Sequence, residues 1–203
     1  MEFRRVVAKR RMVRAYDPDR PVPAEIRERL LEHAIHAPSA GFSQGWGFLV
    51  LEEAADRDAF WAAATPQEDV WQKWLVNMRT APLIIVPHSN KDIYLDRYAE
   101  QDKGWTDRDE SRWPVPYWDI DAGFASLLML LTAVDEGLGA CFFGIPPERM
   151  DAYRAAFGVP ASYTAIGAIS VGYRTESEQS GSPRKRVRRP VDEVVHRGRW
   201  SAG

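Results

Sequence analysis

Two clusters of basic residues are the first candidates for chemistry in this chain of 203 residues. They lie near the two ends of the sequence, at Arg4, Arg5, Lys9, Arg10, Arg11 and Arg14 and at Arg184, Lys185, Arg186, Arg188 and Arg189. Neither cluster contains an acidic residue. The rest of the chain contains the other 16 of the 27 basic residues and all 29 acidic residues, so it is strongly acidic. Because guanidinium groups bind phosphate through paired hydrogen bonds, the clusters indicate one anion site built from both ends or, alternatively, two solvated ends.

Nucleic acid and membranes are not expected partners, because proteins that coat them are more often basic over a whole face. The longest nearly uncharged apolar run, 122–134, has 13 residues. A membrane-spanning helix needs about 20. The basic amino terminus lacks the apolar stretch of about 7–15 residues found in secretory signals. The sequence therefore predicts a cytoplasmic protein without a transmembrane helix.

The common arrangements of catalytic side chains are missing from the sequence. Ser39 lacks the flanking residues of a nucleophile elbow, and neither a P-loop nor a Rossmann fingerprint occurs. Glu32, His33 and His36 could share one helical face, but no third histidine lies nearby. They are interpreted as surface residues, so no metal site is predicted.

Residues 92–119 form a polar segment that is poor in aliphatic side chains yet rich in aromatic ones. The rings are Tyr94, Tyr98, Trp105, Trp113, Tyr117 and Trp118. A long excursion of this kind in a compact domain is typical of a lid or binding loop. We expect part of this aromatic area to face a ligand; the alternative is packing on the domain surface.

The surrounding pattern predicts one α+β domain over residues 1–203. Helical spacing or helix boundaries occur at 3–11, 23–37, 56–64, 70–78, 121–136 and 147–157. Short apolar runs of strand length occur at 47–51, 82–86, 139–145 and 164–171. Residues 174–189 are expected to form an exposed basic loop.

The predicted helix 121–136 is apolar nearly all the way round, so protein must cover it on every side. In a chain this short, a partner subunit could supply part of that cover. A central core helix in a monomer is the alternative.

Six short motifs occur in one order along about 180 residues. They are R-R-x-x-R at 10–14, A-P-S-x-x-x-x-Q-x-W at 37–46, an A-P strand start at 81–86, D-x-G-x-A at 121–125, G-L-G-x-x-x-x-G at 137–144 and R-x-P at 188–190. In this order the chain resembles the nitroreductase-like FMN-dependent oxidoreductases. The resemblance implies an obligate α+β homodimer, in which a central mixed sheet is flanked by helices and each FMN lies between two subunits.

The same resemblance implies which residues hold the cofactor. Basic residues would bind the flavin phosphate, namely Arg10, Arg11, Arg14, Arg186 and Arg188. Residues Pro38, Ser39, Ala40 and Gln44 would lie against the flavin ring, with Ser39 and Gln44 offering hydrogen bonds. Phe143 and Gly144 would approach the opposite edge, where a backbone N–H bonds flavin N5, and Asn77 is a weaker candidate for the pyrimidine edge.

Three positions depart from the pattern of the family. Met12 stands where many relatives have a small hydroxyl residue, Phe42 where many have Asn, and Gly45 where many have Pro. We expect the first to remove a phosphate donor, the second to offer an aromatic face to the substrate, and the third to loosen the turn.

The expected activity is ping-pong catalysis, in which NAD(P)H reduces FMN and a conjugated acceptor such as a nitroaromatic or quinone is then reduced. The acceptor would meet Phe42, Trp113, Tyr117 and Trp118. Because the chemistry takes place at the flavin, no catalytic side chain is predicted. The alternatives are a non-catalytic protein that binds or stores flavin and a specialised branch of the family, such as a deiodinase, a flavin-cleaving enzyme or an azoline oxidase.

Overall fold

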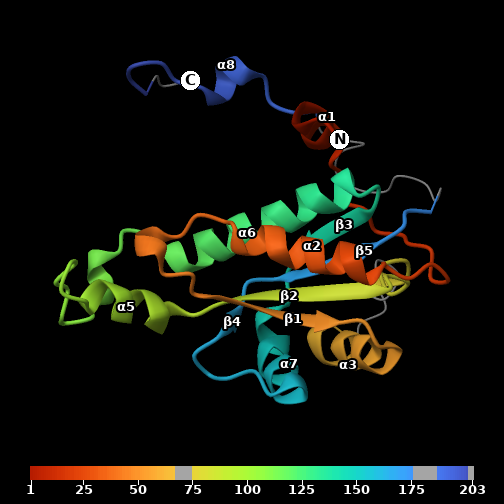
Figure 1. The fold of residues 1–203 in the computed structure, drawn as a ribbon, viewed down its shortest axis with the longest axis horizontal. Coiled ribbons are helices and arrows are strands. Elements are labelled where there is room, and N and C mark those ends of the chain that lie inside the picture. The colour runs from red at the N-terminus through yellow and green to blue at the C-terminus, as the bar shows by residue number, and fades with distance from the viewer. Residues whose placement is uncertain (67–74, 176–186, 201–203) are drawn as a thin grey trace.

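Five short strands form one sheet at the centre of the protein (Figure 1). The computed structural model describes residues 1–66, 75–175 and 187–200. The strands are β1 (Trp46–Leu51), β2 (Leu83–Ser89), β3 (Gly139–Phe143), β4 (Thr164–Ala165) and β5 (Ala168–Gly172). Their order is β1-β2-β5-β3, with β4 beside β2. The predicted strand 164–171 is therefore two strands.

The four pairings between these strands are antiparallel. A parallel contact among the described residues is the isolated bridge between Met12 and Ala140, where the N-terminal segment runs beside β3. The expected α+β fold with a central sheet is thus confirmed. Among the described residues, however, the predicted mixture of parallel and antiparallel pairing depends on the Met12–Ala140 bridge, which lies outside the named strands.

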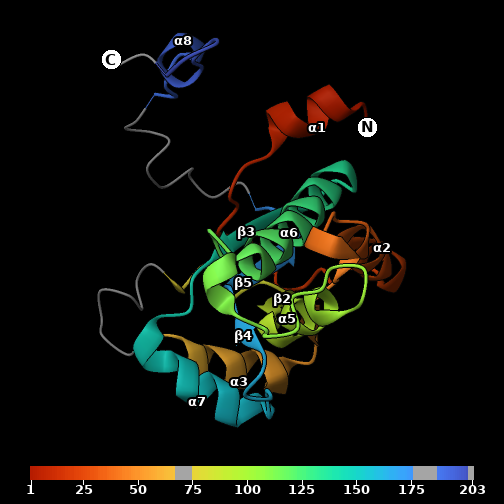
Figure 2. The same ribbon diagram turned by 90° about the vertical axis from the view of Figure 1, so that its left-hand side faces the viewer.

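Helices cover both faces of the sheet (Figures 1 and 2). One face carries α2 (Ala24–Ile35) and α6 (Tyr117–Asp135), which pack on each other, and the other carries α3 (Ala54–Ala64) and α7 (Met150–Phe157). The predicted helix 70–78 lies mostly outside the described residues. Further α-helices among the described residues are α1 (Phe3–Lys9), α5 (Lys91–Ala99) and α8 (Val191–Val194).

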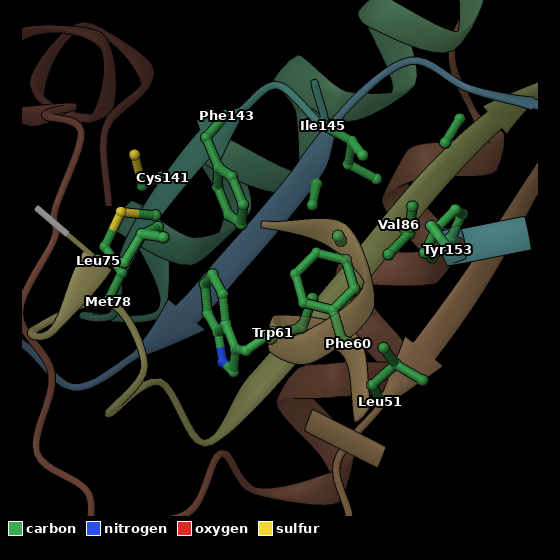
Figure 3. Close-up of a cluster of buried hydrophobic side chains, with 14 residues drawn as sticks. Leu51, Phe60, Trp61, Leu75, Met78, Val86, Cys141, Phe143, Ile145 and Tyr153 are labelled. Carbon is green, nitrogen blue, oxygen red and sulfur yellow. The ribbon is translucent and has the colours of Figure 1, made fainter. Parts of the chain in front are cut away.

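The core has two halves because β2 is buried on both of its faces. Side chains alternate along a strand, so Ile84 and Val86 contact one helix layer, and Leu83 and Ile85 contact the other. On the α3 and α7 side the core is strongly aromatic (Figure 3). There the Trp61 ring stacks on Phe143, with 5.6 Å between the ring centroids.

Helix α6 begins at Tyr117, four residues before the predicted start, and has 19 residues. By length and composition alone it could cross a membrane. In this structure, however, Ala125, Met129 and Ala133 are fully buried in the core that α6 shares with α2 and the sheet. It is therefore placed as a core helix.

The excursion 92–119 is more ordered than the sequence indicates, because it overlaps helix α5. The Asn90 side chain caps this helix by accepting a hydrogen bond from the Asp92 N–H at 3.0 Å. Tyr94 and Leu95 bury the inner face of the helix while the other side chains remain polar. Two buried residues in nine give only a weak helical pattern, so the sequence does not predict this helix.

The two ends of the chain lie at the periphery. Helix α8 stands apart from the sheet in both views (Figures 1 and 2). Of the predicted loop 174–189, residues 176–186 lie outside the described residues, and residues 187–189 are exposed. Arg174 pairs with Tyr16 in an isolated antiparallel bridge.

Candidate functional site

The turn Pro38–Gln44 connects α2 to β1 and has an unusual backbone. It includes a single 3₁₀ turn over Ala40–Phe42. Gly41, Phe42 and Gln44 have φ angles of 62°, 56° and 53°. Positive φ is uncommon for residues other than glycine, so this conformation must be held by contacts around it.

Ser39 and Ser43 hold the turn from within. The Ser39 Oγ accepts a hydrogen bond from the Gln44 N–H at 3.0 Å. The Ser43 hydroxyl donates to the Ala40 carbonyl at 2.7 Å. A hydroxyl that accepts one hydrogen bond keeps its own hydrogen, so Ser39 can still donate to a ligand. The Gln44 side chain is exposed and lies on the same turn.

A buried carboxylate, Asp121, holds the start of the turn from α6. Its Oδ2 accepts hydrogen bonds from the Ala40 N–H at 2.8 Å and from the Tyr94 hydroxyl at 2.9 Å. Burial, and next the hydrogen bond to Asp121, raise the pKa of Tyr94 well above its ordinary value. Asp121 thus joins the turn, α5 and α6 at one point, a role that its D-x-G-x-A motif did not reveal.

Gly45 lies where α5 packs against the turn, so its lack of a side chain has a packing reason besides the expected loosening of the turn. A Cβ at this position would lie 2.4 Å from the Tyr94 ring and 2.8 Å from the Asn90 carbonyl. The Gly45 carbonyl accepts a hydrogen bond from the Asn90 N–H at 2.7 Å. The glycine therefore lets α5 approach the turn closely.

Three of the predicted phosphate-binding arginines, Arg10, Arg11 and Arg14, flank the segment that pairs with β3. The Val13 N–H donates to the Ala140 carbonyl at 2.9 Å, and a Cβ on Gly139 would lie 2.7 Å from Val13. The Nη1 of Arg10 is buried and has no hydrogen-bond partner among the described residues. A guanidinium nitrogen that is shielded from water needs an acceptor, and a phosphate oxygen would supply one.

Arg11 and Arg14 make local contacts. Arg11 Nη1 donates to the carbonyls of Ala8 and Arg10, at 2.8 and 3.0 Å. Arg14 Nη1 donates to the Met12 carbonyl at 3.4 Å. Both side chains extend from the segment that runs beside β3.

The end of β3 carries Phe143 and Gly144. Phe143 is buried against Trp61, whereas Gly144 is exposed and a Cβ there would meet nothing within 4 Å. A cavity of about 300 Å³ opens beside it, lined by 64–66, Leu75 and 143–146. The backbone at Gly144 is therefore accessible to a ligand, as an N–H that bonds a flavin would need to be.

Two predicted cofactor residues lie elsewhere, and a third is outside the described residues. Asn77 is exposed, and its carbonyl accepts a hydrogen bond from Thr80 Oγ1 at 2.7 Å. Thr80 Oγ1 in turn contacts the Tyr16 backbone, which follows the basic segment. Arg188 is exposed on the C-terminal segment that bears α8, and Arg186 lies outside the described residues.

The two halves of the predicted flavin site lie at the same end of the sheet but at opposite edges. The turn Pro38–Gln44 precedes β1 at one edge, whereas Gly144 follows β3 at the other. Three strand spacings of about 4.8 Å separate these edges by roughly 14 Å. Within one chain, the two halves of the predicted flavin site are therefore not adjacent.

The predicted substrate residues divide into two groups. Phe42 is 74% exposed, and Tyr117 is partly exposed at the start of α6. The Trp113 ring, by contrast, packs against five other rings, those of Tyr94, Tyr98, Trp105, Tyr117 and Trp118, with centroid distances of 4.5 to 6.1 Å. The excursion thus has an aromatic cluster of its own, in which the Trp113 ring packs against other rings instead of facing a ligand alone.

Within the part of the chain that the structure describes, no three His, Cys, Asp or Glu side chains could hold a metal ion together. The arrangement consists instead of a rigid turn, an arginine-rich segment and an open strand end. Such an arrangement can position a flat ligand that carries a phosphate group.

Comparisons with known proteins identify the fold and the family. A "putative NADH dehydrogenase/NAD(P)H nitroreductase" of Archaeoglobus fulgidus is 26% identical over 98% of this chain and 99% of its own length. An NADH dehydrogenase of Thermus thermophilus is 28% identical over 96% of this chain and 95% of its own length. A solved structure from Exiguobacterium sibiricum, a "putative nitroreductase in complex with FMN", has the same fold, with a TM-score of 0.72 and 22% identity over 99% of this chain and 98% of that chain. The model of the Nitroreductase family matches residues 7–173, and the chain therefore belongs to this family.

Proposed function

We propose that the protein is an FMN-dependent oxidoreductase that takes electrons from NAD(P)H and reduces a small conjugated acceptor such as a nitroaromatic or quinone. Membership of the Nitroreductase family and the names of the relatives support an oxidoreductase. The observation that carries the FMN proposal is the buried Arg10 Nη1, which lacks an acceptor among the described residues. It lies on the basic segment where a phosphate would bind.

The residues present fit FMN at both ends of the cofactor. Arg10, Arg11 and Arg14 would hold the phosphate, and Arg186 and Arg188 would join them from the C-terminal segment. Ser39 and Gln44 would bind the ring edge, while the accessible backbone at Gly144 would meet the side that bears N5. When bound, FMN supplies two-electron redox chemistry between NAD(P)H and the acceptor.

The side chains would act by binding and orientation. The turn held by Asp121 fixes Ser39 and Gln44 before a ligand arrives, so little ordering is needed on binding. Phe42 and Tyr117 offer exposed aromatic faces on which a flat acceptor can stack. No side chain has to form a covalent bond to the substrate.

We further propose that the working protein is a homodimer. Tyr117, Ile120, Phe124 and Leu127 form an exposed apolar stripe along α6 at spacings of three and four residues. A second copy on this stripe would cover it. It could also bring the turn of one subunit to the β3 end of the other and thereby close the separation of roughly 14 Å, or three strand spacings.

Anaerobic stopped-flow reduction tests this function. The FMN-loaded protein should lose its flavin absorbance when it is mixed with NADH or NADPH, and regain it when a quinone or nitroaromatic is added. A bound flavin that neither nicotinamide reduces would instead indicate a protein that only binds or stores flavin.

A further inference from the structure

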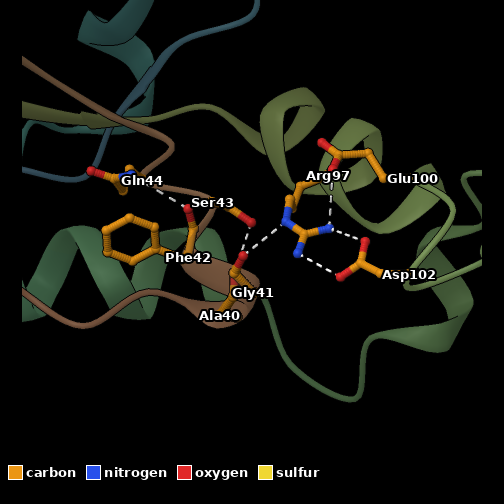
Figure 4. Close-up of polar contacts among 8 residues, drawn as sticks. All are labelled: Ala40, Gly41, Phe42, Ser43, Gln44, Arg97, Glu100 and Asp102. Atoms are coloured by element: carbon orange, nitrogen blue, oxygen red, sulfur yellow. Dashed lines mark hydrogen bonds and ion pairs between the residues drawn. The ribbon is translucent and has the colours of Figure 1, made fainter.

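Arg97 of α5 contacts the backbone of the flavin-facing turn from outside (Figure 4). Its Nε donates to the Gly41 carbonyl at 3.0 Å. This carbonyl belongs to the residue at φ 62° that begins the run of positive φ angles. The bond therefore acts directly beside Phe42, whose φ of 56° is uncommon for a residue that has a side chain.

The Arg97 guanidinium is fixed in place by carboxylates. Nη1 and Nη2 donate to the two oxygens of Asp102 at 2.7 and 2.8 Å, and Nη1 also contacts Glu100 at 3.2 Å. This two-pronged pair leaves Nε as the donor that faces Gly41 (Figure 4). A lysine lacks this geometry, because its donors share one nitrogen, whereas the planar guanidinium pairs with a carboxylate through two nitrogens and donates from Nε in another direction.

The aromatic cluster of the excursion completes the support. A Cβ on Gly41 would lie 2.7 Å from the Tyr98 ring, so this ring covers the turn beside Arg97. Tyr98 packs in turn against Trp113 and Trp105, at 4.5 and 4.9 Å between centroids. The excursion thus contacts the turn in two ways: the Tyr98 ring packs against Gly41, and the Arg97 guanidinium donates a hydrogen bond to the Gly41 carbonyl.

We propose that Arg97, held by Asp102, is a positioning residue that sets the shape of the Ser39–Gln44 turn and through it the affinity and environment of the flavin. This rests on the proposed flavin site. The excursion is thereby assigned a role as a clamp on the cofactor side of the site, in addition to any contact with substrate. Arg97 acts through the Gly41 carbonyl and touches no reacting atom.

Four variants test the clamp: Arg97→Lys, Asp102→Asn, Asp102→Glu and Arg108→Gln. FMN is titrated into apo protein, and the near-ultraviolet and visible circular dichroism of the bound flavin is recorded. We expect Arg97→Lys and Asp102→Asn to weaken FMN binding about tenfold and to change the flavin dichroism. Asp102→Glu keeps a carboxylate for Arg97, so its FMN affinity should stay within about twofold of the parent affinity. Arg108 also pairs with two carboxylates of the excursion, Asp92 and Asp96, but does not contact the turn, so Arg108→Gln should leave both readouts unchanged.

A second readout needs no cofactor. Amide hydrogen exchange of apo protein should become faster at residues 40–44 in Arg97→Lys and unchanged in Arg108→Gln. In the double variant Arg97→Lys with Asp102→Asn, FMN affinity should match that of Arg97→Lys, because Asp102 acts through Arg97.

The outcomes separate the two proposals. Parent-like FMN affinity and dichroism in Arg97→Lys would overturn the clamp while leaving the proposed function intact, and so would faster exchange in the turn without any change in FMN binding. A parent protein that binds no FMN would overturn the proposed function and the clamp together.

Discussion

The two halves of the proposed flavin site differ in how completely one chain builds them. The turn Pro38–Gln44 is held from within by Ser39 and from outside by Asp121 and Arg97. On the β3 side, Arg10 Nη1 is buried without an acceptor among the described residues, in the segment that pairs with the start of the strand, and Gly144 is exposed beyond the end of the strand. The comparison indicates that the turn is preformed, whereas the side at β3 still lacks the acceptor that Arg10 needs and that a bound phosphate would supply.

The largest expected effect comes from breaking the surface that would join the halves. Phe124→Glu places a charge in the middle of the exposed stripe on α6. We expect the dimer dissociation constant to rise roughly 100-fold or more, because an unpaired charge would be buried in both subunits. Sedimentation velocity measures this change, and FMN content should fall with it.

Ile35→Glu is the matched control. Like Phe124, Ile35 is an exposed apolar residue of a helix, but it is the last residue of α2 and does not belong to the stripe on α6. It should leave dimer and flavin unchanged. An FMN-loaded monomer of Phe124→Glu would contradict a site shared by two subunits.

The phosphate half can be tested by itself with Arg10→Ala. Loss of a charged hydrogen bond should weaken FMN binding by about 1.5–3 kcal/mol. Riboflavin lacks the phosphate, so its affinity should barely change, and calorimetric titration with both ligands separates the two cases. Lys9→Ala, an exposed neighbour, serves as the control. Equal losses for FMN and riboflavin would show that Arg10 does not bind the phosphate.

The aromatic residues of the turn half should separate into structural and substrate-facing ones. Trp113→Ala should lower the free energy of unfolding by about 2 kcal/mol, less than the loss at a fully buried aromatic because Trp113 is half-buried. Phe42→Ala should hardly change stability but should raise the Michaelis constant for a quinone about 2- to 10-fold through lost stacking. Denaturant melts and steady-state kinetics measure these effects, and a reversed pattern would exchange the two roles.

The smallest effect concerns the sheet that connects the halves. Burial lowers the pKa of His88, whose Nε2 contacts the Tyr153 hydroxyl at 2.9 Å. Below the ordinary histidine pKa of about 6.5, the unfolded chain binds a proton that the folded chain does not. Stability should therefore fall as the pH drops below about 7, by at most about 1.4 kcal/mol per pH unit. His88→Gln should flatten this dependence in denaturant melts at pH 7.5 to 5, and an unchanged slope would contradict the assignment.

Much of the fold was predictable because its signals are local. Each of the strands β1, β2 and β3 is marked by its own short apolar run, and α2 is marked by the spacing of its apolar residues. The Pro38–Gln44 turn is marked by its own proline and glycine. Helix α5 was missed because most of its side chains are polar.

The supports of the turn could not be predicted from local patterns. Ala40 and Asp121 are 81 positions apart, and Gly41 and Arg97 are 56 positions apart, so no local spacing connects them. The aromatic cluster around Trp113 likewise requires distant rings to meet through the folding of α5 and α6. The sequence therefore predicts a lid or binding loop at residues 92–119 and not the aromatic cluster that the structure shows.

The most direct test of the shared site mixes two defective proteins. One carries Arg10→Ala and Arg14→Ala, and the other carries Ser39→Ala and Gln44→Ala; each alone should bind FMN weakly. After dissociation and random reassociation, half of the dimers should be mixed, each with one unaltered site, so about a quarter of all sites should regain parent-like FMN affinity. If no tight FMN sites appear in the mixture, although the parent protein treated in the same way recovers its own, the two halves do not come from two subunits.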